Sequence, residues 1–397
     1  MRDVYVTGAY MTRFDRHVER GLSSLAREAV EGAMRDAGTA AEAVEFVAFG
    51  NAAAGILTGQ EMIRAQIALA GSGLDGVPMV NVENACATAS SAFHLAFNAV
   101  RSGQHDVALA VGAEKMHVAD RKLPNVALAR AVDVEELVAE QGDAVLTEGA
   151  GPLFMEIYAG FARDYMDLSG ATRQDLATAA AKNRFHGSLN TNAQFRQAVT
   201  AEEVLASRMI VDPLTLFMCS PISDGAAALV LGTREAARDA GGPLVRVRAS
   251  AMQTGRKEGP DDAVARAAAK AYESGGIGPE DLDLIELHDA AIPAEFIVLE
   301  ELGVAAAGDA LRLLRDGATR LGGRLPVNPS GGLLSRGHPI GATGAGQLVE
   351  LADQLRGRAG QRQVDGARIA LAENAGGILG GGSAVAVVTV LECLNVH

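Results

Sequence analysis

The chain has 397 residues, 48% of them hydrophobic and 21% charged, a composition typical of a globular protein long enough for two or three domains. A formal net charge of −14 argues against a general nucleic-acid binder. Three cysteines without repeated spacing predict neither a disulfide framework nor a metal site, so we expect no metal and a reducing cytoplasmic compartment. The sequence shows no secretory signal and no apolar stretch of membrane-spanning length.

The first patterned segments alternate between strand and helix. Residues 4–8 read as a strand, residues 28–38 as an amphipathic helix that ends at a glycine, and residues 44–51 as a second strand. An apolar run over 78–82 then ends just before Cys86, and small residues followed by apolar side chains at helical spacing come after it. This order predicts a strand, a tight turn and a helix whose first turn carries the thiol.

A cysteine in that position is a candidate nucleophile. The first turn of a helix presents free N–H groups and the positive end of the helix dipole, and both favour thiolate over thiol. We therefore expect Cys86 to react at neutral pH. The alternative is that Cys86 is a small buried hydrophobic residue.

The second half of the chain repeats the pattern of the first. A helix at 263–272, a strand at 282–289, a short strand at 326–328, a helix at about 344–355 and a strand at 367–372 follow in the same order. Apolar strands flanked by helices predict an α/β fold in which two mixed β-sheets of a duplicated unit sandwich helices.

The stretch between the two copies has no counterpart in the second half. It is helical and polar, and Thr172 with Asp175 forms a capping-box pattern at the start of one helix. We interpret it as an inserted subdomain that contributes to a ligand site. The predicted domains are a first half at 1–114 plus 211–242, an insertion at 115–210, and a second half at 243–397.

Two histidines accompany Cys86 as candidates. His338 lies in the sequence Gly-His-Pro-Ile-Gly-Ala-Thr-Gly over Gly337–Gly344, where glycines allow close backbone approach to a ligand and the proline stiffens the turn. His288 precedes Asp289 at the end of a predicted strand. The glycines after Gly341 do not follow the order of a dinucleotide-binding loop, so nucleotide binding is not expected there.

With these segments in view, the chain resembles the thiolase family over essentially its full length. The matching features are the Cys86 turn, Ser223–Ala228, the Gly337–Gly344 loop and the glycine-rich Asn374–Gly382 segment. The His288-Asp289 pair and the stretch 183–196 resemble the sterol-carrier-protein-type branch. The resemblance implies the duplicated thiolase fold, coenzyme A thioesters as substrates, no permanently bound cofactor, and a homodimer or homotetramer in which the Cys86-bearing domains pair edge to edge.

The resemblance also implies roles for individual residues. Cys86 would attack an acyl-CoA thioester and carry the acyl group, His338 would take the thiol proton, and His288 would bind the second thioester oxygen. The insertion would cover coenzyme A. The implied oxyanion hole consists of backbone N–H groups from Cys86, Gly376, Gly377 and Gly380, and the implied coenzyme A contacts are Lys182, Arg184 and Ser335.

The match to the family breaks at one position. Ordinary thiolases carry a second catalytic cysteine near the C-terminus, but Ala370–Gly377 contains none, and the residue after His288-Asp289 is Ala290. Glu373 lies at or next to the vacant position and could act as the base if desolvation raised its pKa. The alternative is that its side chain points elsewhere at the end of a strand. Further candidates for the missing role are His117, Asp289, Cys219 and Cys393.

The main expectation is an acyl-CoA C-acyltransferase that forms or cleaves a β-ketoacyl thioester, or acylates a carbon nucleophile, through acyl-Cys86. The vacant position motivates a second hypothesis, a retro-aldol carbon–carbon lyase acting on acyl-CoA side chains with a small partner protein that has an OB fold and a zinc ribbon. A third is a non-catalytic acyl-CoA carrier.

Overall fold

The computed structural model describes residues 2–238, 243–259 and 262–394. Their strands form a sheet in the order β3-β2-β4-β7-β1-β8-β11-β10-β9 and a small second sheet of β5 and β6. The strands of the first half are β1 (Tyr5–Met11), β2 (Phe46–Gly50), β3 (Met79–Val82), β4 (Val107–Glu114) and β7 (Gly225–Gly232). Those of the second half are β8 (Leu244–Thr254), β9 (Leu284–Glu286), β10 (Ile369–Leu379) and β11 (Gly382–Leu394).

The large sheet consists of two half-sheets, one from each half of the chain, that lie edge to edge. In the described part of the chain they join where β1 pairs with β8, through Tyr5 opposite Arg246 and Val6 opposite Val245. Parallel pairs (β2 with β3 and β4, and β9 with β10) occur beside antiparallel ones in each half. The prediction of two mixed sheets is confirmed, with the addition that the two are continuous through this short contact.

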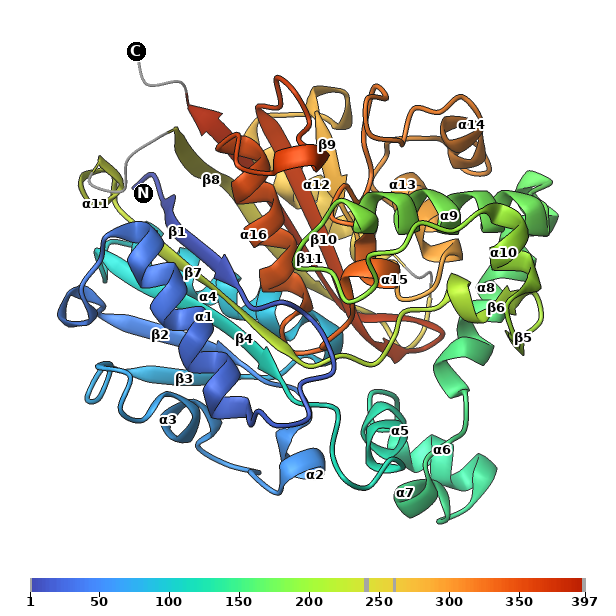
Figure 1. The fold of residues 1–397 in the computed structure, drawn as a ribbon, viewed down its shortest axis with the longest axis horizontal. Helices are drawn as coiled ribbons and strands as arrows, with labels where there is room; N and C mark the ends of the chain where they lie inside the picture. The colour runs from blue at the N-terminus through green and yellow to red at the C-terminus, as the bar shows by residue number, and fades with distance from the viewer. Residues whose placement is uncertain (1, 239–242, 260–261, 395–397) are drawn as a thin grey trace.

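Two helices lie between the half-sheets. Both α4 (Thr88–Arg101) and α16 (Thr343–Leu355) contact strands of both halves and each other, and they occupy the middle of the molecule in Figure 1. On the outer faces, α1 (Leu22–Ala37) packs on the first half-sheet and α12 (Ala263–Gly275) on the second. The layers therefore alternate between helix and sheet, as the duplicated pattern predicts.

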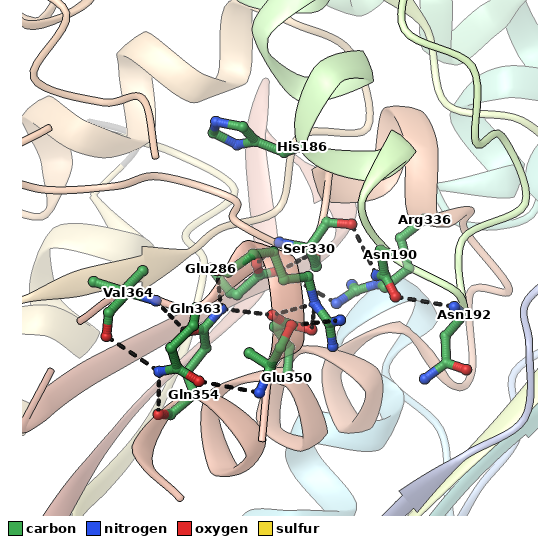
Figure 2. Close-up of polar contacts among 12 residues, drawn as sticks. His186, Asn190, Asn192, Glu286, Ser330, Arg336, Glu350, Gln354, Gln363 and Val364 are labelled. Carbon is green, nitrogen blue, oxygen red and sulfur yellow. Dashed lines mark hydrogen bonds and ion pairs between the residues drawn. The ribbon is translucent and has the colours of Figure 1, made fainter. Parts of the chain in front are cut away.

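The central helix α16 is buried on nearly all sides, including its polar residues. Those polar side chains form hydrogen bonds within the protein. The amide nitrogen of Gln354 donates to Glu350, and the backbone N–H of Val364 donates to the amide oxygen of Gln354, as Figure 2 shows. Glu350 also accepts two hydrogen bonds from Arg362. These pairs fix α16, and with it the loop that precedes the helix.

The insertion lies to one side of the sandwich (Figure 1). Thr172 and Asp175 form the predicted capping box at the start of α9. The helices of the insertion are α5 (Leu123–Leu128), α6 (Val134–Gln141), α7 (Val145–Glu148), α8 (Leu153–Ser169), α9 (Arg173–Ser188) and α10 (Ala201–Ala206). The insertion ends within β5 (Met209–Val211), which pairs with β6 (Leu214–Thr215) just beyond it.

The remaining helices are short. They are α2 (Ala54–Thr58), α3 (Arg64–Leu69), α11 (Arg234–Arg238), α13 (Pro293–Glu301), α14 (Ala310–Arg315) and α15 (Gly332–Arg336), with 3-10 turns η1 (Ala41–Ala43), η2 (Ala85–Ala87), η3 (Leu216–Met218), η4 (Pro279–Asp281) and η5 (Gly360–Arg362). Among the described residues, no helix combines the length and apolar character needed to cross a membrane.

Candidate active site

Cys86 lies in a tight turn between β3 and α4. The turn is the 3-10 segment Ala85–Ala87, and Ala85 adopts a left-handed backbone with φ of 46°, which is strained for a residue with a side chain. The backbone N–H of Asn84 donates to the Thr88 hydroxyl at 2.9 Å and so fixes the turn to α4. The thiol therefore lies just before the helix rather than in its first α-helical turn.

His338 occupies the matching position before α16. Its backbone N–H donates to the Ser223 hydroxyl at 2.9 Å. The N-terminal turns of α16 and α4 approach very closely, because a Cβ on Gly344 would come within 1.9 Å of the Ser90 hydroxyl. This glycine contact brings the Cys86 turn and the His338 loop together.

His288 reaches the same point from the end of β9. Its backbone N–H donates to a carboxylate oxygen of Glu373 at 3.0 Å, which ties it to the neighbouring strand β10. One ring nitrogen of His288, one of His338 and the Cys86 sulfur all lie within 4.8 Å of one another. The two imidazole rings are 5.2 Å apart between centroids. Segments from both halves of the chain thus converge on one site.

The three side chains line a cavity of about 500 Å³. Its walls are largely apolar, with three aromatic residues from α8 of the insertion, and its charged residues come from several segments of the chain. The aromatic residues are Phe154, Tyr158 and Phe161, and the charged ones are Glu61, Arg64, Glu83, Arg130 and Glu301. A cavity of this kind suits an apolar acyl group.

The electrostatics of the cavity correct one expectation. Burial, aided by the negative charge of Glu114, raises the pKa of the Cys86 thiol to about 12, although the N–H groups of Gly377 and of Cys86 itself act in the opposite direction. The prediction of a thiolate at neutral pH is therefore wrong. Desolvation outweighs the N–H groups that the sequence places at this turn.

Both histidines are neutral in this environment. Burial lowers the pKa of His288 to about 4 and holds the pKa of His338 well below its usual range. The Thr343 hydroxyl donates to the carbonyl of Pro339 at 3.1 Å, so it accepts from Nδ1 of His338 at 2.7 Å. Because Nδ1 then carries the proton, Nε2 of His338 keeps a lone pair that can accept the proton of the thiol.

Glycines of β10 approach the Cys86 turn from the other side. A Cβ on Gly376 would lie 2.3 Å from the carbonyl oxygen of Asn84 and 2.6 Å from the backbone nitrogen of Ala87, so only glycine fits. Gly376 and Gly377 line the cavity. Gly380 does not: it lies in the turn after β10, packed against the carbonyl of Lys257, and its assignment to the oxyanion hole is wrong.

The predicted coenzyme A contacts do not line this cavity. Lys182 is buried in an ion pair with Glu295 at 2.6 Å, and Ser335 is fully buried, so neither can reach a phosphate group in solvent. Arg184 contacts the rings of Phe195 and Phe217, outside the cavity that holds the thiol. Lys182 and Ser335 are therefore wrong as coenzyme A contacts, whereas the assignment of Arg184 stays a prediction.

Glu373 has the raised pKa that the base hypothesis requires but not the position. Burial raises its pKa to about 7. One carboxylate oxygen accepts from the backbone of His288, the other has no partner, and the side chain does not line the cavity. Glu373 therefore holds the backbone of His288 in place, and its carboxylate lies outside the cavity that an acyl group would enter.

The other candidates for the missing second thiol or base also lie outside the cavity. Asp289 is buried and accepts from Asn183 and from the backbone of Leu333. His117 faces Asp224. Cys219 does not line the cavity, and Cys393, expected in a C-terminal tail, is buried in β11.

Two residues of the site escaped the sequence analysis. Glu114, at the end of β4, accepts from the backbone of Ala52 and of Gly341, and so joins the cavity wall of the first half to the His338 loop. The sequence signal that could have identified Glu114 is a single acidic residue at the end of an otherwise apolar strand. Tyr158 has a hydroxyl whose pKa is raised by burial and by the charges of Cys86 and Glu373, which places it near them. A tyrosine within an amphipathic helix gives no comparable signal.

A thiol and two imidazoles at this separation could also hold a zinc ion, because cysteine and histidine are its preferred ligands. An ion bound there would occupy the sulfur needed for nucleophilic attack. The expectation of no metal therefore stays a prediction.

Family models match nearly the whole chain: the thiolase N-terminal domain over residues 4–235 and the thiolase C-terminal domain-like model over residues 249–391. The chain is 41% identical to an acetyl-CoA acetyltransferase of Methanothermobacter thermautotrophicus over 97% of this chain and 99% of that protein. It is 36% identical to benzoylsuccinyl-CoA thiolase subunit BbsB of Thauera aromatica over 95% of each. Human sterol carrier protein 2 is 34% identical over 98% of this chain and 71% of its own length.

Solved structures agree with these matches. The Ltp2-ChsH2(DUF35) aldolase superposes with a TM-score of 0.82 at 26% identity, covering 98% of each chain. Human mitochondrial 3-ketoacyl-CoA thiolase superposes with a TM-score of 0.74 at 15% identity, covering 99% of each chain. The chain therefore belongs to the thiolase family.

Proposed function

We propose that this protein is an acyl-CoA C-acyltransferase that carries its acyl group on Cys86 and forms or cleaves β-ketoacyl-CoA, or acylates another carbon nucleophile. The observation that supports this proposal most strongly is the convergence of one thiol and two neutral imidazoles within 4.8 Å at an apolar cavity. Acyl transfer between thiols needs a group that both attacks and leaves well, and a cysteine sulfur does both.

In the first step, the Cys86 sulfur attacks the thioester carbon while its proton passes to Nε2 of His338. The tetrahedral oxyanion is held by the backbone N–H groups of Cys86 and Gly377, whose loop closes on the turn through Gly376. Collapse breaks the bond from carbon to the coenzyme A sulfur, which takes the proton from His338. The products are acyl-Cys86 and free coenzyme A, and His338 is neutral again.

In the second step, a base removes an α-proton from a second acyl-CoA, and the carbanion attacks acyl-Cys86. Nε2 of His338 is available for this proton because coenzyme A has removed the first one. His288 has an unpartnered buried Nε2, which suits a donor to the enolate oxygen of the second thioester. Attack releases the Cys86 sulfur, which recovers the proton from His338, and leaves β-ketoacyl-CoA.

A second candidate function is retro-aldol cleavage of acyl-CoA side chains, together with an OB-fold zinc-ribbon partner protein. Two observations favour keeping it. The fold resembles the Ltp2-ChsH2(DUF35) aldolase, and of the chain's three cysteines only Cys86 lines the cavity. The third hypothesis, a non-catalytic acyl-CoA carrier, has no observation in its favour once the thiol and imidazoles are seen to converge.

The proposal includes coenzyme A thioesters as substrates without a permanently bound cofactor, a homodimer or homotetramer, and a cytoplasmic location. All three cysteines are free thiols, in keeping with a reducing compartment. The insertion (115–210) covers the acyl group through α8 in this proposal, since three of its aromatic side chains line the cavity.

The experiment is a turnover assay with pairs of acyl-CoA species, in which free coenzyme A and β-ketoacyl-CoA are both measured. We expect activity in the native protein and in Cys219→Ala, a matched control that removes a thiol outside the cavity, and none in Cys86→Ala. Carbon–carbon cleavage that survives in Cys86→Ala would favour the aldolase candidate. Tight acyl-CoA binding without any turnover would favour the carrier.

A further inference from the structure

A second hollow, of about 450 Å³, lies beside the C-terminal end of α9 and shares no lining residue with the catalytic cavity. Three arginines line it, in a chain whose overall charge is −14. They come from three separate segments: Arg13 follows β1, Arg184 lies on α9, and Arg196 follows that helix.

Arg184 is the unusual member of this group. Only 6% of the residue is exposed, and its guanidinium carbon lies 4.5 Å from the ring centre of Phe195 and 4.6 Å from that of Phe217. The cation thus makes close contacts with two aromatic rings. Its Nε and Nη1 atoms are buried without a hydrogen-bond partner, and no carboxylate pairs with it among the described residues.

A buried cation without a partner is costly, because desolvation is not offset by a charge of opposite sign. The rings occupy none of its N–H groups, so Nε and Nη1 are left to meet a partner. A guanidinium edge of this kind matches the paired oxygens of a phosphate or carboxylate.

The other charges around the hollow leave it positive. Arg13 pairs with Asp15 at 2.8 Å, but its Nε is also buried without a partner. Arg196 is exposed and makes no ion pair within the described part of the chain. The one acid of the lining, Glu203, is engaged by the backbone of Thr200 at 2.7 Å in the cap of α10.

The walls of the hollow are held in place by main-chain hydrogen bonds. The N–H groups of Gln194 and Phe195 donate to the carbonyls of Arg336 and Ser335 at 3.1 and 3.0 Å. Gln194 also accepts from Ser223 at 2.5 Å, the same hydroxyl that receives the backbone N–H of His338. The site is therefore built on the rigid segment that supports the catalytic histidine loop.

We propose that this hollow is an anion site that binds a phosphate group through the edge of Arg184, assisted by Arg13 and Arg196. A phosphate group here has two sources: the phosphorylated end of a coenzyme A substrate, or a separate phosphate-bearing metabolite. Binding does not require acyl transfer, so this proposal stands or falls independently of the proposed function.

The test is calorimetric titration of the full-length protein with inorganic pyrophosphate at fixed ionic strength. We expect Arg184→Met to weaken binding at least tenfold and Arg196→Gln to weaken it severalfold. Arg312→Gln, which removes an exposed arginine on α14, is the matched control and should bind as the native protein does. Equal affinity in Arg184→Met, or no binding by the native protein at millimolar pyrophosphate, would overturn the proposal.

Thermal unfolding separates a binding role from a structural one. Arg184 has no internal hydrogen-bond or ion-pair partner, and methionine can keep the contacts with the two rings. Arg184→Met should therefore unfold at the native temperature or above, and pyrophosphate should raise the unfolding temperature of the native protein only. A variant that is destabilised yet still stabilised by pyrophosphate would contradict the site. Arg196→Gln changes an exposed side chain and stays informative if Arg184→Met folds poorly.

The source of the phosphate follows from competition with coenzyme A. If the hollow takes the phosphorylated end of the substrate, pyrophosphate competes with coenzyme A, and Arg184→Met raises KM for acyl-CoA without changing kcat. If it takes a separate metabolite, coenzyme A binds equally well in the presence of pyrophosphate. Either result supports the site and identifies its ligand.

Discussion

The reactivity of the Cys86 sulfur depends on residues that are far from it in sequence. Glu114 and the apolar walls raise its pKa to about 12, whereas the backbone of Gly377 opposes the shift. Since the pKa values of both histidines are lowered, the resting site holds a thiol and neutral imidazoles rather than an ion pair. In the proposed mechanism, proton transfer to His338 therefore accompanies attack on the thioester.

The pH dependence of alkylation tests this description. The pKa of the Cys86 thiol is raised to about 12. At pH values below that pKa, each increase of one pH unit therefore raises the thiolate fraction tenfold. We expect the rate of Cys86 modification by iodoacetamide, followed by peptide mass spectrometry, to rise about tenfold per unit from pH 7 to 9 without a plateau. A plateau beginning below pH 8 would reveal a thiolate–imidazolium pair and contradict this assignment.

The residue-scale errors of the sequence analysis share one cause. Lys182 reads as a surface cation on a polar helix, but its partner Glu295 is 113 positions away and only the fold brings them together. The Cys86 pKa was expected to fall because the local turn is visible in sequence, whereas the desolvation that dominates it comes from distant segments. The sequence shows which groups are neighbours along the chain, but it does not show which side chains the fold will bury.

At the scale of elements, the site depends on the close approach of β10 to the Cys86 turn. We expect Gly376→Ala to destabilise the protein by about 1–3 kcal/mol, because the added Cβ would overlap the backbone of Asn84 and Ala87. It should also abolish acyl transfer by displacing the oxyanion-binding N–H groups.

The matched control is Gly21→Ala. Gly21 has an ordinary φ of −86°, and a Cβ there meets nothing within 4 Å. The free energy of unfolding, measured by denaturant titration, and the turnover rate are to be compared for both variants and the native protein. Full activity and native stability in Gly376→Ala would show that β10 does not shape the site.

Elements with strong periodicity or a capping signal could be predicted from sequence. The helix α16, the capped start of α9 and the strand before Cys86 all lie where their patterns place them. The role of Gly380 was not predictable in the same way, because a glycine-rich run does not reveal which member faces the cavity and which forms the hairpin turn. The aromatic wall from α8 was missed because its residues read as an ordinary buried helix face.

At the scale of the whole molecule, several exposed apolar residues lie on or near elements at one edge of the large sheet. Strand β3 forms that edge, and Val80 on it is 44% exposed. Ile67 on α3, Leu95 on α4 and Met252 on β8 are also exposed, on elements that contact β3 or α4. An unpaired edge with apolar surroundings fits the edge-to-edge dimer that the family resemblance implies.

The proposed dimer predicts that the native protein sediments as a dimer at micromolar concentration and that Val80→Lys sediments as a monomer, measured by sedimentation equilibrium. The charge would be buried at the pairing edge in the dimer, which makes association unfavourable. Leu168→Lys, at a position that is 64% exposed on α8, is the control and should leave the dimer intact. A native protein that sediments as a monomer, or a Val80→Lys variant that remains dimeric, would remove the β3 edge from the proposal.

The central claim is that the Cys86 sulfur carries the acyl group, and its most direct measurement is mass spectrometry of peptides from protein mixed with a range of acyl-CoA species and quenched in acid. We predict an acyl mass on the peptide that contains Cys86, lost in Cys86→Ala and formed at least a hundredfold more slowly in His338→Ala. An acyl group on any other residue, or no adduct with any acyl chain while coenzyme A is still released, would contradict this account.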